Sequence, residues 1–202
     1  LEQNLARIGK VAPEMFWAPL TGPLWGYRRK ARLSVRYVHK KGRVLVGFRE
    51  RYGRFVADLE ECHVLDPRVA GQLVPLAELI HGMDARSAIP QIEVACGDAR
   101  AALVFRHLEP LSEADLARLR SFETDSGLAL LLQPGGPATI HPLTPPAPEL
   151  TFAFPDLGLE LEFGPSDFIQ VNGEMNRRMV ARALDLLDPQ PGEPDYVVIA
   201  TT

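Results

Sequence analysis

The feature that most constrains the fold is a run of strict alternation that begins shortly after Trp25. Between residues 31 and 37, apolar side chains alternate with Arg32, Ser34 and Arg36. A period of two residues places the two sets on opposite faces of a β-strand. Together with the turn-forming residues that follow, the pattern predicts a three-stranded β-meander, with strands at 31–37, 44–48 and 55–59 and turns at 40–43 and 51–54.

Beyond the meander, helical periodicity alternates with short apolar strands. Asp66-Pro67 is a typical helix start, and Ser112 with Asp115 three residues later is a shortened capping box. The predicted helices cover 67–81, 113–125 and 174–187, after a helix tail at 1–10 and a proline-rich connector at 13–23. The predicted strands cover 91–95, 101–105, 128–132, 150–154, 159–163 and 196–200. This order predicts an α+β fold with mostly antiparallel sheets and packed helices.

Basic residues are concentrated in one segment of an otherwise acidic chain. The formal net charge of the 202 residues is −4. Arg28–Arg54 holds eleven Lys/Arg and one acidic residue, a net +10, whereas the remainder holds eleven basic and 25 acidic residues, a net −14. Acidic surface repels phosphate, so a single basic segment leaves one face for a polyanion. The distribution predicts nucleic-acid binding by this segment.

Aromatic residues accompany the first cations of this segment. Tyr27-Arg28-Arg29-Lys30-x-Arg32 places one ring beside four cations, and Trp25 lies two residues earlier. Aromatic rings stack on unpaired bases while Arg and Lys bind phosphates, which is typical of proteins that bind single-stranded or looped RNA. The predicted RNA-binding residues are therefore Tyr27, Arg28, Arg29, Lys30 and Arg32. The alternative is a solvated face on which Lys and Arg protect a sheet edge.

A second stretch, Gly164–Asn172, leads into the last predicted helix. Gln170 and Asn172 bring amide groups to the helix start, where free backbone N–H groups favour polar or anionic ligands. The stretch is a candidate ligand site, and the alternative is a strand-to-helix corner with Asn172 as N-cap. The helix is expected to bury Met175, Met179, Ala183 and Leu186 and to keep Arg177, Arg178 and Arg182 outside.

The two cysteines predict no disulfide framework. Cys62 and Cys96 lie in dissimilar contexts, which agrees with a reducing compartment. Cys62-His63 supplies too few ligands for a metal site, and both cysteines are expected to pack as small apolar residues. The sequence has no signal-peptide pattern and no apolar run near the roughly 20 residues that span a bilayer, so a cytoplasmic protein without a membrane partner is expected.

Six segments, taken in order, carry a resemblance to a known family: Trp25–Ser34, Val46–Arg49, Cys62–Pro67, Asp167–Asn172, Met179–Leu184 and Leu187–Gly192. Together they resemble the bacterial 23S rRNA (uracil-5-)-methyltransferases. The resemblance covers about residues 24 to 193, and its most specific part is Phe168-Ile169-Gln170-Val171-Asn172.

The resemblance implies a protein of three parts: an OB-like RNA-binding domain, a central α/β domain and a Rossmann-like domain that binds S-adenosylmethionine. In those terms the chain divides into a helix tail and connector (1–23), a central RNA-binding domain (24–172), and a linker helix with the first strand of a truncated methyltransferase domain (173–202). The resemblance also implies that Gln170 contacts S-adenosylmethionine. It makes Cys62 the fourth ligand of a 4Fe-4S cluster, whose other three cysteines this sequence lacks.

The reaction implied by the resemblance is methylation of a uridine in 23S rRNA, with no DNA partner. A cysteine thiolate adds to C6 of uracil, C5 takes the methyl group, and a base removes the C5 proton. That cysteine and that base are not among these residues, so the chain alone is expected to be inactive and to supply RNA binding and cofactor-side support. The alternatives are a tRNA uracil-5-methyltransferase and a freestanding, non-catalytic α+β RNA-binding domain.

Overall fold

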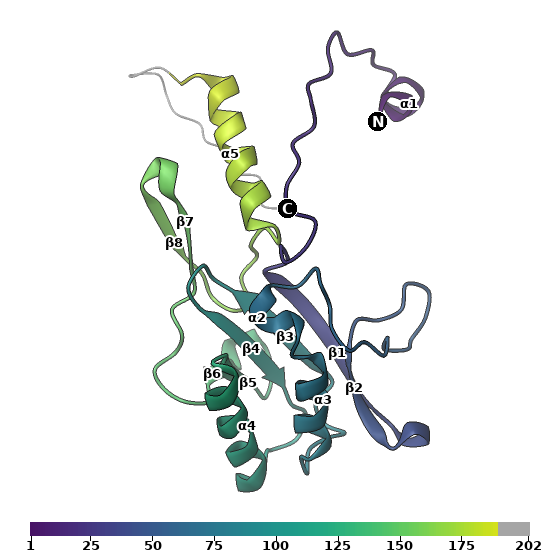
Figure 1. Cartoon of the computed structure of the whole chain (residues 1–202), viewed down its shortest axis with the longest axis vertical. Coiled ribbons are helices and arrows are strands. Elements are labelled where there is room, and N and C mark those ends of the chain that lie inside the picture. The colour runs from purple at the N-terminus through teal and green to yellow at the C-terminus, as the bar shows by residue number, and fades with distance from the viewer. Residues whose placement is uncertain (190–202) are drawn as a thin grey trace.

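The computed structural model describes residues 1–189, so the strand predicted at 196–200, the expected first strand of a Rossmann-like domain, lies outside the described residues. The centre of the fold is a six-stranded sheet in the order β2-β1-β3-β4-β5-β6 (Figure 1). Its strands are β1 (Lys30–Val38), β2 (Arg43–Gly47), β3 (Gln91–Cys96), β4 (Ala101–Arg106), β5 (Ala129–Gln133) and β6 (His141–Pro142). Within this sheet β4 and β5 are parallel and the other neighbours antiparallel, which confirms the predicted α+β class.

The alternating run forms β1, and β2 is its hairpin partner as predicted. Gly42 closes the turn between them with a φ of 63°, a left-handed conformation that suits glycine. The third predicted strand, at 55–59, is wrong. That segment pairs with the chain after β2 only at the single bridge between Arg49 and Val56, and Leu59 then packs against the core beside the helices. β2 is therefore the terminal strand of the sheet, and the other side of β1 pairs with β3.

The helix predicted at 67–81 is interrupted at Gly71. Asp66 caps its start by accepting a hydrogen bond from the Arg68 amide, as the sequence predicts. The first piece, α2 (Pro67–Ala70), ends at Gly71, and α3 (Leu73–His81) begins two residues later. Glycine has a low helix propensity, which favours a break at this position.

The helix α4 (Glu113–Ser126) begins where the sequence predicts, with the Ser112 hydroxyl accepting a hydrogen bond from the Asp115 amide. The Asp115 side chain is fully buried and does not complete the capping box. It accepts hydrogen bonds from the backbone amides of Asp84 and Ala85, at 2.8 and 3.1 Å. The carboxylate therefore joins α4 to the loop that follows α3.

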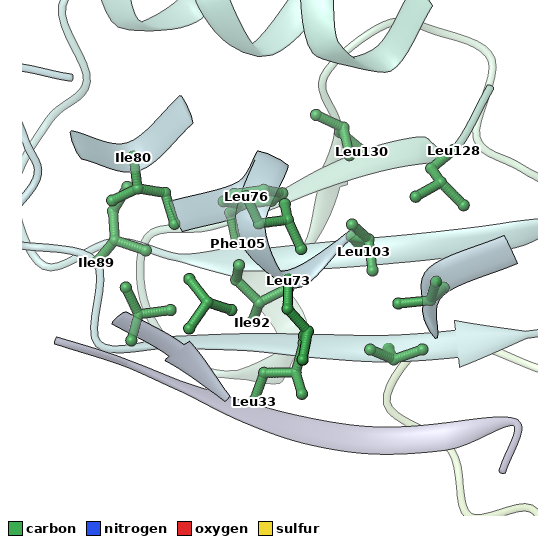
Figure 2. Close-up of a cluster of buried hydrophobic side chains, with 14 of the residues drawn as sticks. Leu33, Leu73, Leu76, Ile80, Ile89, Ile92, Leu103, Phe105, Leu128 and Leu130 are labelled. Atoms are coloured by element: carbon green, nitrogen blue, oxygen red, sulfur yellow. The ribbon is translucent and has the colours of Figure 1, made fainter. Parts of the chain in front are cut away.

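The main core lies between the sheet and the helices α3 and α4 (Figure 1). Figure 2 shows Leu73, Leu76 and Ile80 from α3 directed at the apolar side chains of the sheet. The sheet contributes Leu33, Ile92, Leu103, Phe105 and Leu130, each at most 1% exposed. Because these residues come from alternate strand positions, they define the helix-covered face of the sheet.

A smaller core lies on the opposite face and covers only part of it. Ala95, Ala102, Val104 and Leu131 from the sheet pack there against Leu150, Phe163 and Ile169. Leu150 and Phe163 flank a two-stranded ribbon of β7 (Thr151–Phe154) and β8 (Leu159–Glu162), which forms as predicted, and Ile169 lies in the loop after it. We call the uncovered part of this face, around Ser34, Gln91 and Arg106, the open face.

The helix α5 (Gly173–Leu187) extends away from the sheet, beside the ribbon (Figure 1). Its predicted burial is wrong, since Met179 and Leu186 are 48% and 46% exposed. The helix packs on the amino-terminal connector instead of the core. The Arg178 guanidinium donates a hydrogen bond to the Thr21 carbonyl, and Arg182 lies 5.0 Å from the centre of the Trp17 ring.

The start of the chain forms a short helical segment, as predicted. It consists of α1 (Glu2–Asn4) and a π-helical turn at Leu5–Gly9, and Lys10 ends it in a left-handed conformation. Throughout residues 1–189, no helix combines the length and the apolar character needed to cross a bilayer.

Candidate functional site

The two stretches that the sequence singles out lie side by side, although about 140 residues separate them. Arg28 forms an isolated β-bridge with Asn172 on one side and with Leu65 on the other. The Arg29 amide donates a hydrogen bond of 2.8 Å to the Val171 carbonyl. These backbone contacts place the beginning of the basic segment against the beginning of α5.

The Asp98 carboxylate joins this region together. It accepts hydrogen bonds from the Arg29 guanidinium, from the Arg177 guanidinium at 2.9 Å, and from the Ala153 amide at 2.8 Å. Arg177 also donates to the Ala153 carbonyl at 2.7 Å. One carboxylate in the β3–β4 turn therefore ties together the entry to β1, the ribbon and α5.

Burial on its own would raise the pKa of Asp98. The Ala153 amide and the Arg29 and Arg177 guanidinium groups outweigh that effect and hold the pKa of the Asp98 carboxyl below its usual range. Asp98 is consequently ionised at neutral pH. The Arg29 side chain is only 12% exposed, so this ion pair is sheltered from solvent on the arginine side.

Lys30 holds the other end of the candidate stretch. Its ammonium group donates hydrogen bonds to the Pro165 carbonyl and, at 2.9 Å, to the Asp167 carbonyl. Burial lowers the pKa of Lys30 from its ordinary value, and the nearby Glu93 and Asp167 carboxylates partly oppose that effect. Lys30 therefore fastens the loop before Gln170 to β1.

A hollow of about 240 Å³ lies between these segments and includes Tyr27 and Gly173 in its lining. Its charged groups are already paired. Asp98 binds Arg29 and Arg177, and separate ion pairs join Arg68 to Asp66 and Arg178 to Glu174. The hollow is therefore polar but has little uncompensated positive charge.

Gln170 lies at the edge of this region and is partly buried. The preceding Ile169 is 7% exposed and packs in the smaller core, whereas Phe168 is 55% exposed. Asn172 is the N-cap of α5, since its side-chain oxygen accepts a hydrogen bond from the Met175 amide at 3.0 Å. Among the described residues, the Gln170 side-chain amide has no hydrogen-bond partner, so it is available to a ligand.

The predicted RNA-binding residues have different surroundings. Arg29 and Lys30 hold protein groups, as described above. Arg32 is 69% exposed and binds Glu93 at 3.0 Å, and the partly buried Arg28 makes no ion pair within residues 1–189. Trp25 is 64% exposed and meets the His63 ring edge-on, with 5.8 Å between ring centres. The assignment of Tyr27, Arg28, Arg29, Lys30 and Arg32 to RNA remains a prediction.

The cysteines lie far from any set of metal ligands. Cys62 is partly buried against the main core, and Cys96 is fully buried in β3. Burial raises the pKa of the Cys96 thiol to about 12, so the group stays protonated and unreactive. Within the part of the chain that the structure describes, no three His, Cys, Asp or Glu residues gather around a common point.

Sequence reasoning missed Asp98 and Arg177. Asp98 lies in the turn between the strands predicted at 91–95 and 101–105 and carries no predicted role, and Arg177 is predicted to face solvent. Their partnership joins positions that are 79 residues apart, and no periodicity in the sequence reports such a contact. The available signal was Gly97-Asp98 at a hairpin tip, where a carboxylate next to a glycine can accept hydrogen bonds from a crossing chain.

Comparison with known proteins identifies close relatives. The chain is 56% identical over 198 residues to the 23S rRNA (uracil(1939)-C(5))-methyltransferase RlmD of Paracidovorax citrulli, and 53% identical over 193 residues to the protein of that name from Verminephrobacter eiseniae. These matches cover 98% and 96% of the chain but 40% of each relative. The chain thus spans about two fifths of the length of these curated relatives. No family model matches it.

A solved structure supports the fold. The Pyrococcus abyssi tRNA (uracil-54, C5)-methyltransferase, in complex with S-adenosyl-L-homocysteine, superposes with a TM-score of 0.63 at 16% sequence identity. The superposition covers 92% of the chain and 46% of that protein. At this identity the match concerns the fold alone. Over nearly its whole length, the chain therefore matches one segment of proteins named as bacterial 23S rRNA (uracil-5-)-methyltransferases.

Proposed function

We propose that the chain is the central, RNA-binding part of an enzyme that transfers a methyl group from S-adenosylmethionine to C5 of a uridine in 23S rRNA. The observation that carries this proposal is identity above 50% to proteins named for that reaction, over nearly the whole chain. The basic segment and its contact with the start of α5 support it. RNA held near Arg28 lies beside the Gln170 stretch, because Arg28 and Asn172 share a β-bridge.

S-adenosylmethionine fits the surroundings of Gln170. The side-chain amide can both donate and accept hydrogen bonds, it is partly buried, and within residues 1–189 it has no partner. When bound, the cofactor supplies the methyl group. In this chain Gln170 positions the cofactor, while Ile169 in the smaller core and Lys30 at the Asp167 carbonyl hold the backbone that leads into Gln170.

An iron-sulfur cluster does not fit the cysteines of this chain. A 4Fe-4S cluster takes four cysteine ligands as a rule, and the sequence has only two cysteines, of which Cys96 is sealed in the sheet. Cys62 can supply one ligand at most. No step of the proposed function passes through a cluster.

The test is a binding titration of the 202-residue chain with a 23S rRNA stem-loop at several salt concentrations. Affinity is expected to fall steeply as salt rises, because binding to phosphates releases counterions. Arg28→Ala is expected to flatten the dependence by about 0.7 in the log–log slope, the value for one phosphate contact on a single strand. Arg29 is a poor choice for this test, because its removal would leave Asp98 without a main partner.

Competing nucleic acids distinguish an rRNA substrate from a tRNA substrate. A tRNA of the same length is expected to bind less tightly than the stem-loop, and duplex DNA less tightly still. Preference for tRNA would favour a tRNA uracil-5-methyltransferase. Affinity for neither RNA, or affinity that does not depend on salt, would overturn the proposal.

A further inference from the structure

The strongest uncompensated positive charge lies outside the candidate site. Arg29, Lys30 and Arg177 are occupied by protein groups, whereas Arg49 and Arg106 are exposed and, in the part of the chain that the structure describes, form no ion pair. They reach the open face from opposite directions. Arg106 ends β4, and Arg49 follows β2 on the other side of β1.

These residues line a hollow of about 620 Å³ in the open face. Its lining includes Arg32, Ser34 and Gln91 on the sheet and Arg49, Arg106 and Leu108 around them. The sheet part follows from strand register, since Ser34 lies opposite Gln91, and Gln91 lies opposite Arg106. The hollow therefore combines three guanidinium groups with an amide and a hydroxyl on a rigid sheet.

A loop with two exposed rings rises from the same place. Arg49 and Val56 form its base through their β-bridge. Tyr52, at the turn of the loop, is 90% exposed, and Phe55, next to its base, is 60% exposed. The guanidinium of Arg51 lies 5.0 Å from the centre of the Tyr52 ring, and that of Arg54 lies 6.0 Å from the Phe55 ring centre. Each ring thus has a cation beside it and a surface open to solvent.

Carboxylates only partly offset this charge. Glu93 lies in the neighbouring row of the sheet, where it accepts hydrogen bonds from Arg32 and Gln91. Glu50 lies within the loop. Arg36, exposed on the same face of β1, adds a further cation that has no ion pair within residues 1–189. Arginine forks on a rigid surface suit phosphate, and exposed rings suit unpaired bases, which together point to single-stranded RNA rather than a duplex.

We propose that the open face and the loop at residues 49–56 form a second RNA-contact surface, which binds an unpaired segment of the rRNA. Arg49 and Arg106 bind backbone phosphates at the hollow, beside Arg32 and its partner Glu93, and Tyr52 and Phe55 stack on bases that lie beyond it. This inference rests on the proposed function and adds to it a defined path for the RNA, separate from the Gln170 stretch.

The experiment measures binding of fluorescein-labelled oligouridylate and of a duplex RNA to the 202-residue chain by fluorescence anisotropy. Arg49→Ala combined with Arg106→Ala is expected to weaken oligouridylate binding about tenfold and to reduce the log–log salt slope by about 1.4, or roughly 0.7 for each lost phosphate contact. Tyr52→Leu is expected to weaken it at least fivefold, whereas Tyr52→Phe keeps the stacking ring and is expected to bind like the wild type. Duplex RNA is expected to bind more weakly and to respond little to Tyr52→Leu.

Arg120→Ala is the matched control, since Arg120 is exposed on α4 and lies on the helix-covered side. Ultraviolet crosslinking of 4-thiouridine RNA to the unaltered chain, mapped by mass spectrometry, gives a second readout that needs no variant and is expected at Tyr52 or Phe55. If the wild type binds rRNA but the Arg49/Arg106 and Tyr52→Leu variants behave like Arg120→Ala, this inference is overturned and the proposed function stands. If the wild type fails to bind rRNA, both are overturned.

Discussion

Replacing Asp98 with asparagine tests the contact that holds the candidate site together. The substitution keeps the shape of the side chain and one oxygen that can accept the Ala153 amide, but it removes the charge shared by Arg29 and Arg177. Because the Arg29 side chain is only 12% exposed, losing its counter-charge is expected to cost about 1.5 kcal/mol. The Arg177 pair is 36% exposed on both sides and is expected to contribute only about 0.5 kcal/mol.

The expected loss is therefore about 2 kcal/mol, or about 4–8 °C in Tm for a chain of this length. Urea unfolding at neutral pH measures the loss, and hydrogen exchange locates it, with faster exchange expected in β7 and the first turns of α5. Asp156→Asn is the control, because Asp156 is exposed in the turn of the ribbon.

Measuring the stability of wild type and Asp98→Asn as a function of pH tests whether the charge of Asp98 causes the difference. Since the pKa of Asp98 is lowered in the folded protein, its charge stabilises the fold above the unfolded pKa of about 3.9, and that contribution is lost as pH falls through the lowered value. The difference between wild type and Asp98→Asn is expected to be full at neutral pH, to shrink as pH falls below about 4, and to vanish only below the lowered pKa of Asp98. A difference under 0.5 kcal/mol at neutral pH, or one that persists unchanged in acid, would refute this account.

Three further outcomes are expected from other parts of the fold. Gly97→Ala would place a Cβ 2.8 Å from the Thr151 carbonyl oxygen, so it is expected to destabilise the fold by about 1–3 kcal/mol in urea unfolding; wild-type stability would contradict the close approach. Asp115→Ala leaves two backbone amides of the loop after α3 without acceptors and is expected to cost about 2–4 kcal/mol, whereas exposed Glu113→Ala is expected to cost under 1 kcal/mol. Near neutral pH a maleimide is expected to label Cys62 well before Cys96, whose thiol is buried and protonated; equal labelling rates in mass spectra would argue against a closed core.

Local sequence signals predict the elements that depend on neighbouring residues. The period of two predicts β1 and its hairpin, and the caps Asp66, Ser112 and Asn172 predict three helix starts. These predictions succeed because the contacts that form each element join residues close together in the sequence. The capping hydrogen bonds, for example, join positions two or three residues apart.

The errors arise where a distant segment decides the outcome. The stretch 55–59 has the composition of a strand, but it meets the chain after β2 at one bridge only, and Leu59 packs against the core instead. The apolar side of α5 has a helical period that suits a core, yet the helix lies along the connector, with Arg178 bound to Thr21. In the candidate site, the role of Gln170 stays a prediction from the family resemblance, whereas the contacts of Asp98 form only when Arg29, Ala153 and Arg177 are brought together by folding.

Arg29, Lys30 and Arg32 lie close together at the start of β1. The register of this one strand therefore determines the contacts of all three side chains. A shift of β1 by one residue against β3 would exchange its two faces, moving Leu33 into solvent and the arginines into the apolar interior. The same shift would separate Arg29 from Asp98 and Lys30 from the carbonyls before Gln170. Molecules with the wrong register would therefore lose both the attachment of α5 and the arginine-lined hollow. The candidate site and the open face thus depend on the same strand register.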